Sequence, residues 1–93
     1  MITDRQTLIK RQLIRARAHL LRGSAVEAEA AARRGLKLLE STDLVTEHAN
    51  ALLMLAEVLD ARDLGDAAAA ARSEAVAKLR AKGNLAAVAR LGA

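Results

Sequence analysis

Apolar side chains recur at helical spacing from the start of the chain. In the first stretch they are separated by four, three and four residues, at Ile9, Leu13, Ala16 and Leu20. This spacing places them on one face of a helix, and it predicts a helix over about residues 4–22. Thr3 and Gln6 fit a capping box at its start, and Gly23 can adopt the left-handed conformation that ends a helix.

The second stretch begins at once and carries mostly small side chains on its apolar face. Ser24 and Glu27 repeat the capping-box pattern, and the predicted helix ends near residue 40. Its apolar face consists of Ala28, Ala31, Ala32, Gly35, Leu38 and Leu39. Small side chains let two helix axes approach closely. Glycine inside a helix costs about 1 kcal/mol relative to alanine, so Gly35 indicates a close crossing at that point.

The third stretch has the widest apolar face, which predicts the most buried helix, over about residues 44–61. Asp43 is the expected N-cap, and Glu47 in the next turn suits the helix dipole. The main face is formed by Leu52, Leu55, Ala56 and Leu59, and it is widened by Leu53, Met54 and Val58.

Two further helices follow the turn at residues 63–66. The fourth helix is predicted over about residues 66–81, with an apolar face of Ala68, Ala71, Ala75 and Leu79. Gly83 is suited to end this helix, and Asn84 is suited to cap a last short helix over residues 85–91.

Two halves of the chain match each other at an offset of 40 residues. The matched pairs are Ala16 and Ala56, Gly23 and Asp63, Ala28 and Ala68, and Gly35 and Ala75, whereas Leu20 falls on Asp60. Each half therefore consists of a predicted helix, a tight turn and a second helix. This pattern predicts an all-α fold of stacked antiparallel helical hairpins in a single domain over residues 1–93. Its parts are unit one at about 4–40, unit two at about 44–81 and a short capping helix at about 84–92.

Composition removes several classes of site. The 93 residues include no Pro, no Cys and no aromatic residue, which excludes disulfides, cysteine nucleophiles and cysteine-based metal sites. No apolar run reaches the roughly 18 residues of a membrane span, and the N-terminus lacks the apolar core of a signal peptide. We expect a bacterial cytoplasmic protein with no membrane partner.

No set of residues in the sequence is suited to catalysis or to holding a cofactor. His19 and His48 fall on different predicted helices, and neither has a second ligand at the spacing that a metal site uses. No serine lies in a nucleophile motif, and no glycine-rich phosphate loop is present. Glu57 and Asp60 lie one turn apart, but without an enclosing pocket we interpret them as a solvated edge. We therefore predict a protein without enzymatic activity, metal or cofactor.

Charge is distributed unevenly along the chain, whose net charge is +4. Residues 1–23 carry six Lys and Arg side chains against one Asp, whereas residues 40–66 carry seven acidic side chains against one Arg. If the first and third helices pack together, their charges attract each other, so the basic character does not require nucleic acid. Arg11, Arg15 and Arg22 still form a basic stripe, which leaves a nucleic-acid accessory role as an alternative.

Several of these positions resemble a tetratricopeptide repeat. In that family a Leu and a small residue lie midway along the first helix, a Gly lies at the turn, and two Ala lie seven apart in the second helix. Unit two supplies Leu55, Ala56, Ala68 and Ala75, whereas the family's aromatic positions and its Pro are missing. Residues 49–59 and 81–84 are also similar to the C-terminal repeats of large bacterial transcriptional regulators that join an ATPase to a cyclase-like or winged-helix domain. That resemblance implies a free-standing or excised piece of such a regulator.

The resemblance also implies a concave groove lined by the first helix of each unit. Its basic side would be formed by Lys10, Leu13 and Arg17, and its acidic side by Asn50, Leu53, Glu57 and Asp60. We predict that this groove binds a peptide or a helix of another protein, which would make the chain a protein-interaction or scaffolding module. Two alternatives stay open: self-association through faces that two repeats leave unpaired, and groove walls that pair only with each other.

Overall fold

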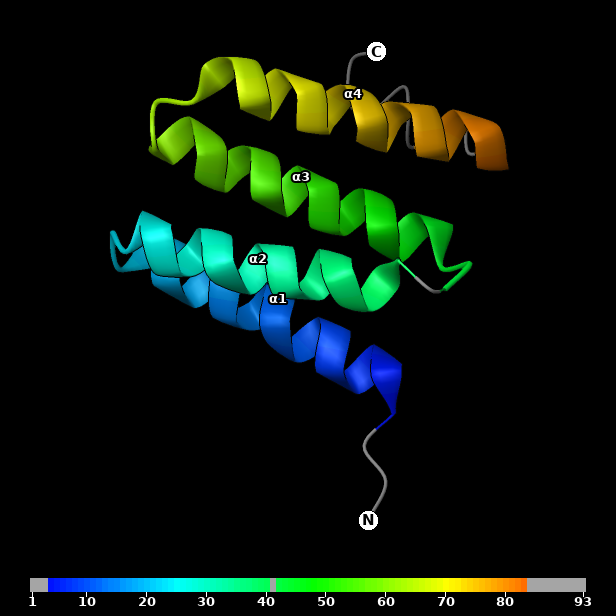
Figure 1. Cartoon of the computed structure of the whole chain (residues 1–93), viewed down its shortest axis with the longest axis horizontal. Helices are drawn as coiled ribbons and strands as arrows, with labels where there is room; N and C mark the ends of the chain where they lie inside the picture. Colours follow the sequence, from blue (N-terminus) through cyan, green and yellow to red (C-terminus); the bar gives the residue numbers. More distant parts are fainter. Residues whose placement is uncertain (1–3, 41, 84–93) are drawn as a thin grey trace.

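Four α-helices form the part of the chain that the structure, a computed structural model, describes: residues 4–40 and 42–83 (Figure 1). They are α1 (Arg5–Leu21), α2 (Ala25–Leu39), α3 (Val45–Ala61) and α4 (Gly65–Lys82). The all-α class predicted from the sequence is confirmed for these residues. The predicted capping helix at about 84–92, as well as Thr3 and Ser41, lies outside the described residues.

The helices follow one another in chain order across the molecule, from α1 (blue) to α4 (yellow to orange) in Figure 1. α1 packs against α2, and α3 packs against α4, with a short turn inside each pair. The two hairpins meet mainly through α2 and α3. α1 also contacts α3, so the first helices of the two hairpins are neighbours.

The turns inside the two hairpins have the same backbone pattern. Gly23 has a φ of +79°, and Asp63, which lies 40 residues later, has a φ of +60°. After each of them an amide closes the preceding helix: Ser24 N–H donates to His19 O at 2.8 Å, and Leu64 N–H donates to Leu59 O at 2.9 Å. This bond is the one that commonly ends a helix at a left-handed residue. Aspartate tolerates that conformation better than most residues, which explains how it can occupy the position of a glycine.

Gly83 ends α4 in the left-handed conformation, as predicted, whereas the side-chain caps predicted at Ser24 and Asp43 do not form. α1 is capped by Asp4, whose side chain accepts a hydrogen bond from Thr7 N–H at 2.8 Å. That bond is the main cause that lowers the pKa of Asp4. Ser24 precedes α2 and Leu44, rather than the predicted Asp43, precedes α3, but neither forms a side-chain cap. Asp4 has the extended ψ of 160° that a capping side chain needs, whereas ψ is 68° at Ser24 and 74° at Leu44.

Alanine and leucine side chains fill the core along the helix interfaces. One cluster draws on all four helices and contains Ala16, Ala31, Ala32, Leu55, Ala56, Leu59, Ala68 and Ala71. Among the described helices, α3 has the most buried residues, as its wide apolar face predicts. Buried positions are paired across the 40-residue offset at Ile9 and Ala49, Ala16 and Ala56, Ala28 and Ala68, Ala31 and Ala71, Gly35 and Ala75, and Leu39 and Leu79. The two hairpins thus bury equivalent faces.

α1 and α2 approach each other most closely around Gly35. A Cβ atom at this position would lie 3.3 Å from Leu13 Cδ2 and 3.6 Å from Gln12 Cβ. A distance of 3.3 Å between two carbon atoms is shorter than their optimal separation, so a side chain at Gly35 would displace Leu13. Glycine therefore sets how near the two helices of the first hairpin can pack.

Candidate peptide-binding surface

The seven residues predicted to line a groove lie on α1 and α3. These are the first helices of the two hairpins, and they contact each other. We call this set the α1–α3 surface. Five of its members are exposed and polar: Lys10, Arg17, Asn50, Glu57 and Asp60. The other two, Leu13 and Leu53, are half-buried. The surface therefore combines polar groups that face solvent with two leucines that are partly accessible.

Arg17 and Glu57 join the two helices of this surface. Arg17 Nη1 lies 2.7 Å from Glu57 Oε2, and Nη2 lies 3.3 Å from Oε1, so the guanidinium contacts both carboxylate oxygens. The two residues are 40 positions apart and hence equivalent in the two hairpins. Their side chains are 47% and 49% exposed, and an ion pair this exposed stabilises a protein by about 0 to 1 kcal/mol. The basic and acidic sides predicted from the sequence neutralise each other here.

Asp60 is directed to a different partner. Its carboxylate forms an ion pair with Arg72 of α4, within its own hairpin, and does not reach α1. The acidic side of the surface is thus smaller than the sequence predicts, because one of its two carboxylates is engaged by α4. Arg72 could not be identified beforehand, since the contact depends on how α3 and α4 are rotated against each other.

The two leucines of the surface pack against different clusters of the core. Leu13 packs against the cluster of Ile9, Leu39 and Ala51, at the corner where α1, α2 and α3 meet. Leu53 packs against a separate cluster between α3 and α4, made of Ala49, Leu52, Ala75 and Leu79. Each leucine therefore contributes an apolar contact that is anchored in a different part of the core.

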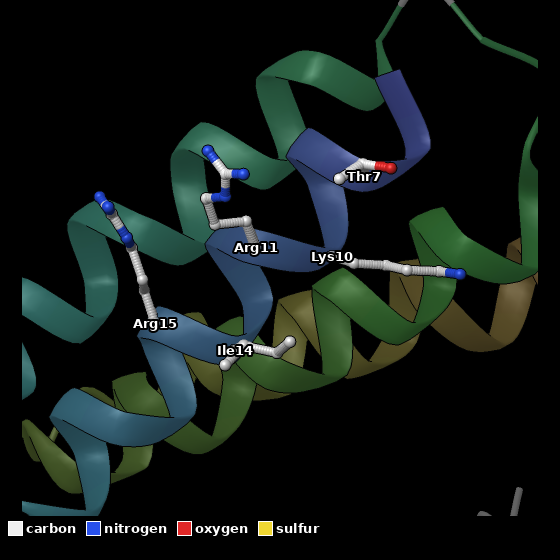
Figure 2. A pocket seen from close by; sticks show the side chains of 5 residues that line it. All are labelled: Thr7, Lys10, Arg11, Ile14 and Arg15. Carbon is white, nitrogen blue, oxygen red and sulfur yellow. The ribbon is translucent and has the colours of Figure 1, made fainter. Parts of the chain in front are cut away.

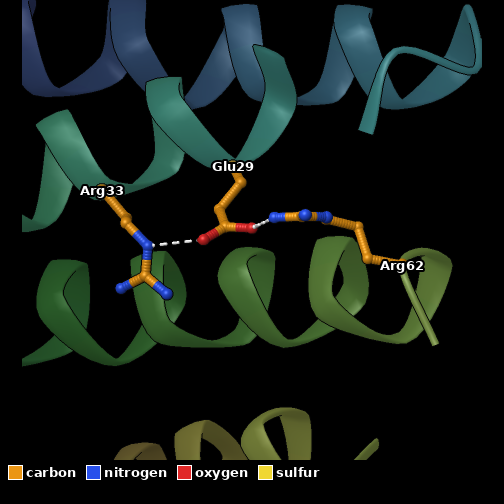
Figure 3. Close-up of polar contacts among 3 residues, drawn as sticks. All are labelled: Glu29, Arg33 and Arg62. Carbon is orange, nitrogen blue, oxygen red and sulfur yellow. Dashed lines mark hydrogen bonds and ion pairs between the residues drawn. The ribbon is translucent and has the colours of Figure 1, made fainter. Parts of the chain in front are cut away.

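A second charged contact, which the sequence analysis did not identify, fastens the two hairpins at their α2–α3 interface. Glu29 of α2 lies between Arg33 on the same helix and Arg62 at the end of α3 (Figure 3). Arg33 Nε donates to Glu29 Oε2 at 2.8 Å, and Arg62 Nη1 donates to Glu29 Oε1. The spacing of four residues between Glu29 and Arg33 could have predicted the first pair. Only the tertiary structure supplies Arg62.

The environment of Glu29 favours its charged form. Its side chain is only 15% exposed. Hydrogen bonds from Arg33, and next from Arg62, lower the pKa of the Glu29 carboxyl, and they outweigh burial, which acts in the opposite direction. Because the folded-state pKa lies below that of the unfolded chain, this contact stabilises the fold fully above the ordinary glutamate pKa. The stabilisation is lost as the pH falls through the lowered pKa of the folded state.

We expect Glu29→Gln to lower the free energy of unfolding at neutral pH by about 1 kcal/mol, since it removes a carboxylate shared by two partly exposed arginines. Urea denaturation of the wild type and the variant, followed by circular dichroism at neutral and acidic pH, measures the difference. The difference should shrink in acid, where Glu29 becomes protonated. Glu74→Gln on the exposed side of α4 serves as the control. A difference that stays constant with pH would show that the Glu29 charge is not the cause.

The described residues offer ionic and apolar contacts without a metal site. Over residues 4–40 and 42–83, no group of three His, Cys, Asp or Glu side chains is placed to hold a metal ion. Burial, followed by the nearby charge of Lys78, lowers the pKa of His48. None of the described helices has the length and apolar character needed to cross a membrane.

No protein family model, no curated protein and no solved structure matches this chain.

Proposed function

We propose that this chain is a non-enzymatic protein-interaction module that binds a peptide or a helix across the α1–α3 surface. The observation that carries the proposal is the Arg17–Glu57 contact, which joins equivalent positions of the two hairpins on one exposed side. The sequence resemblance to tetratricopeptide repeats, and to the repeats of bacterial regulators, supports the same function. In this proposal the chain acts in the cytoplasm as a recognition part of a regulator.

Energetics favour a ligand that carries both signs of charge. Because the Arg17–Glu57 pair is half exposed, opening it costs about 1 kcal/mol or less, and a ligand can replace both partners. An acidic group of the ligand would bind Arg17 and Lys10, and a basic group would bind Glu57. Leu13 and Leu53 then add two separate apolar contacts. Burial of apolar area contributes about 25 cal/mol per Å², which these two leucines can supply without rearrangement of the helices.

The test uses charge exchange rather than simple charge removal. Arg17→Glu combined with Glu57→Arg keeps an ion pair but reverses its polarity, so we expect a stability close to that of the wild type and loss of ligand binding. The wild type is used to capture partners from a bacterial lysate, which are then identified by mass spectrometry and remeasured as purified proteins. The Lys10→Glu, Arg17→Glu variant should also fail to bind.

The control matched to Lys10→Glu, Arg17→Glu is Arg34→Glu, Arg80→Glu. It changes the net charge by the same amount, at two exposed arginines outside the surface. It should bind each purified partner as the wild type does. If the purified partners bind the exchanged variant and the wild type equally, the α1–α3 surface is not the binding site and the proposal is overturned.

A further inference from the structure

The outer face of α1 combines basic and apolar side chains that are directed away from the core. This face is defined by Thr7, Arg11, Ile14, Arg15, Ala18 and Leu21. Thr7, Arg11, Ile14 and Arg15, together with Lys10 of the α1–α3 surface, line a depression of about 320 Å³. Ile14 is 69% exposed and Leu21 is 79% exposed. Figure 2 shows Arg11 and Arg15 extending to one side of the helix and Lys10 to the other.

The equivalent face of α3 is covered by the first hairpin. An offset of 40 residues places Arg11 on Ala51 and Arg15 on Leu55. Ala51 packs with Ile9 of α1 and Leu39 of α2, and Leu55 lies in a cluster with Ala16, Ala31 and Ala32. α3 therefore uses these positions to dock onto the α1–α2 hairpin. On α1 the same positions are exposed, so a helix could dock there in the manner in which α2 docks on α3.

Charge specifies which kind of helix fits. In α3 the docking positions are apolar, whereas in α1 two of them are arginines that flank Ile14. Within residues 4–40 and 42–83, Arg11 and Arg15 form no ion pair. A helix that covers them without acidic groups would bury two uncompensated positive charges, which is strongly unfavourable. The partner must therefore place carboxylates beside an apolar strip.

A second copy of the chain does not offer this chemistry on its other end. The exposed residues of α4, the last described helix, include the basic Arg80 and Lys82 and the acidic Asp66 and Glu74, whereas Arg72 is paired with Asp60. A helix of this mixed charge matches Arg11 and Arg15 less well than an acidic helix does. Nucleic acid is also a poor match, because the chain has no aromatic side chain on which bases could stack. Phosphates bound to the arginines would also leave Ile14 and Leu21 without apolar contacts.

We propose that the outer face of α1 is a docking site for an acidic amphipathic helix of another protein. The carboxylates of this helix bind Arg11 and Arg15, and its aliphatic side chains cover Ile14 and Leu21. The site lies on a different side of α1 from Leu13 and Arg17, and it goes beyond the function proposed for the α1–α3 surface.

The experiment uses a labelled synthetic peptide of about 20 residues, long enough to form a helix, with Leu and Ala at helical spacing flanked by Glu. Fluorescence anisotropy measures its binding to the wild type, and a peptide with Lys in place of Glu is the matched probe. We expect the acidic peptide to bind and the basic peptide to fail. Arg15→Glu should weaken binding about tenfold, as should Ile14→Ser. The control Arg80→Glu should bind as the wild type does.

Three results would overturn the inference. The first is equal binding of the acidic peptide to the wild type and to Arg15→Glu. The second is binding of phosphatidylserine vesicles or of a DNA duplex, lost in Arg15→Glu, with no binding of the peptide. The third is a dimer in light scattering that Arg15→Glu dissociates, which would assign the face to a second copy. The exchanged variant Arg17→Glu, Glu57→Arg should bind the acidic peptide normally. Loss of peptide binding in that variant alone would move the site to the α1–α3 surface.

Discussion

Leu39→Ala should lower the free energy of unfolding by about 2 to 5 kcal/mol. Leu39 is fully buried on α2, in a cluster with Ile9 of α1 and Ala51 of α3. Its side chain therefore lies where α1, α2 and α3 meet, at the junction between the two hairpins. The neighbouring core residues are small or held on rigid helices, so they cannot move in to fill the space that alanine leaves. A domain of this size has a total stability toward the lower end of about 5 to 15 kcal/mol, so the loss should leave the variant close to unfolding.

Urea denaturation followed by circular dichroism measures this effect, and Leu21→Ala is the matched control. Leu21 is 79% exposed, so the same change of side chain should alter the stability by about 0.5 kcal/mol at most. Leu79→Ala makes the equivalent change in the second hairpin, where Leu79 lies in a cluster with Ala49, Leu52 and Ala75. A Leu39→Ala variant as stable as Leu21→Ala would show that the corner between α1, α2 and α3 is not closely packed.

Gly35→Val should lower the free energy of unfolding by about 1 to 3 kcal/mol. A branched side chain at this position must push into Leu13 and Gln12, and so it separates α1 from α2. Gly35→Ala is expected to be nearly neutral, because two effects oppose each other. Alanine improves helix propensity by about 1 kcal/mol, whereas its Cβ would lie 3.3 Å from Leu13 Cδ2, the flexible end of a side chain.

A double-mutant cycle with Leu13→Ala separates these contributions. Removing the Leu13 methyl groups opens the space that valine needs, so Gly35→Val should be less destabilising in the Leu13→Ala background than in the wild type. Thermal and urea unfolding of the four proteins supply the cycle. Strictly additive effects would show that Leu13 is not what limits the side chain at Gly35.

Hydrophobic spacing was sufficient to predict the helices, whereas the details at their ends needed the backbone. The faces that contain Leu13, Ala28 and Leu55 follow from periodicity alone, since each helix must bury one side. Ser24 occupies the N-cap position of α2 but forms no side-chain cap, since its ψ of 68° is not extended, and the N-cap of α3 is Leu44 rather than Asp43. The turn at Asp63 was also hard to predict from residue type, because this aspartate adopts the positive φ that Gly23 adopts in the first hairpin.

The candidate surface could be predicted only in part, for a related reason. The opposite charges of Arg17 and Glu57 are visible in the sequence, and the 40-residue offset places them at equivalent positions. Which charges meet depends on the rotation of each helix about its axis, and in the folded chain Asp60 pairs with Arg72 of α4. Glu29 joins the two hairpins because Arg62, at the end of α3, lies beside it in the fold. The spacing of residues along the chain does not predict this contact.

The order in which the helices touch has a consequence for how the chain reaches its fold. α1 packs mainly on α2 and α3 mainly on α4, so most contacts join segments that are close in sequence. Closing a short loop loses little chain entropy, and proteins dominated by such local contacts fold in about microseconds to milliseconds. Each hairpin can close without waiting for the other. The slowest step should then be the docking of two formed hairpins along α2 and α3. The contacts of Leu39 with α3 and of Glu29 with Arg62 should therefore form last.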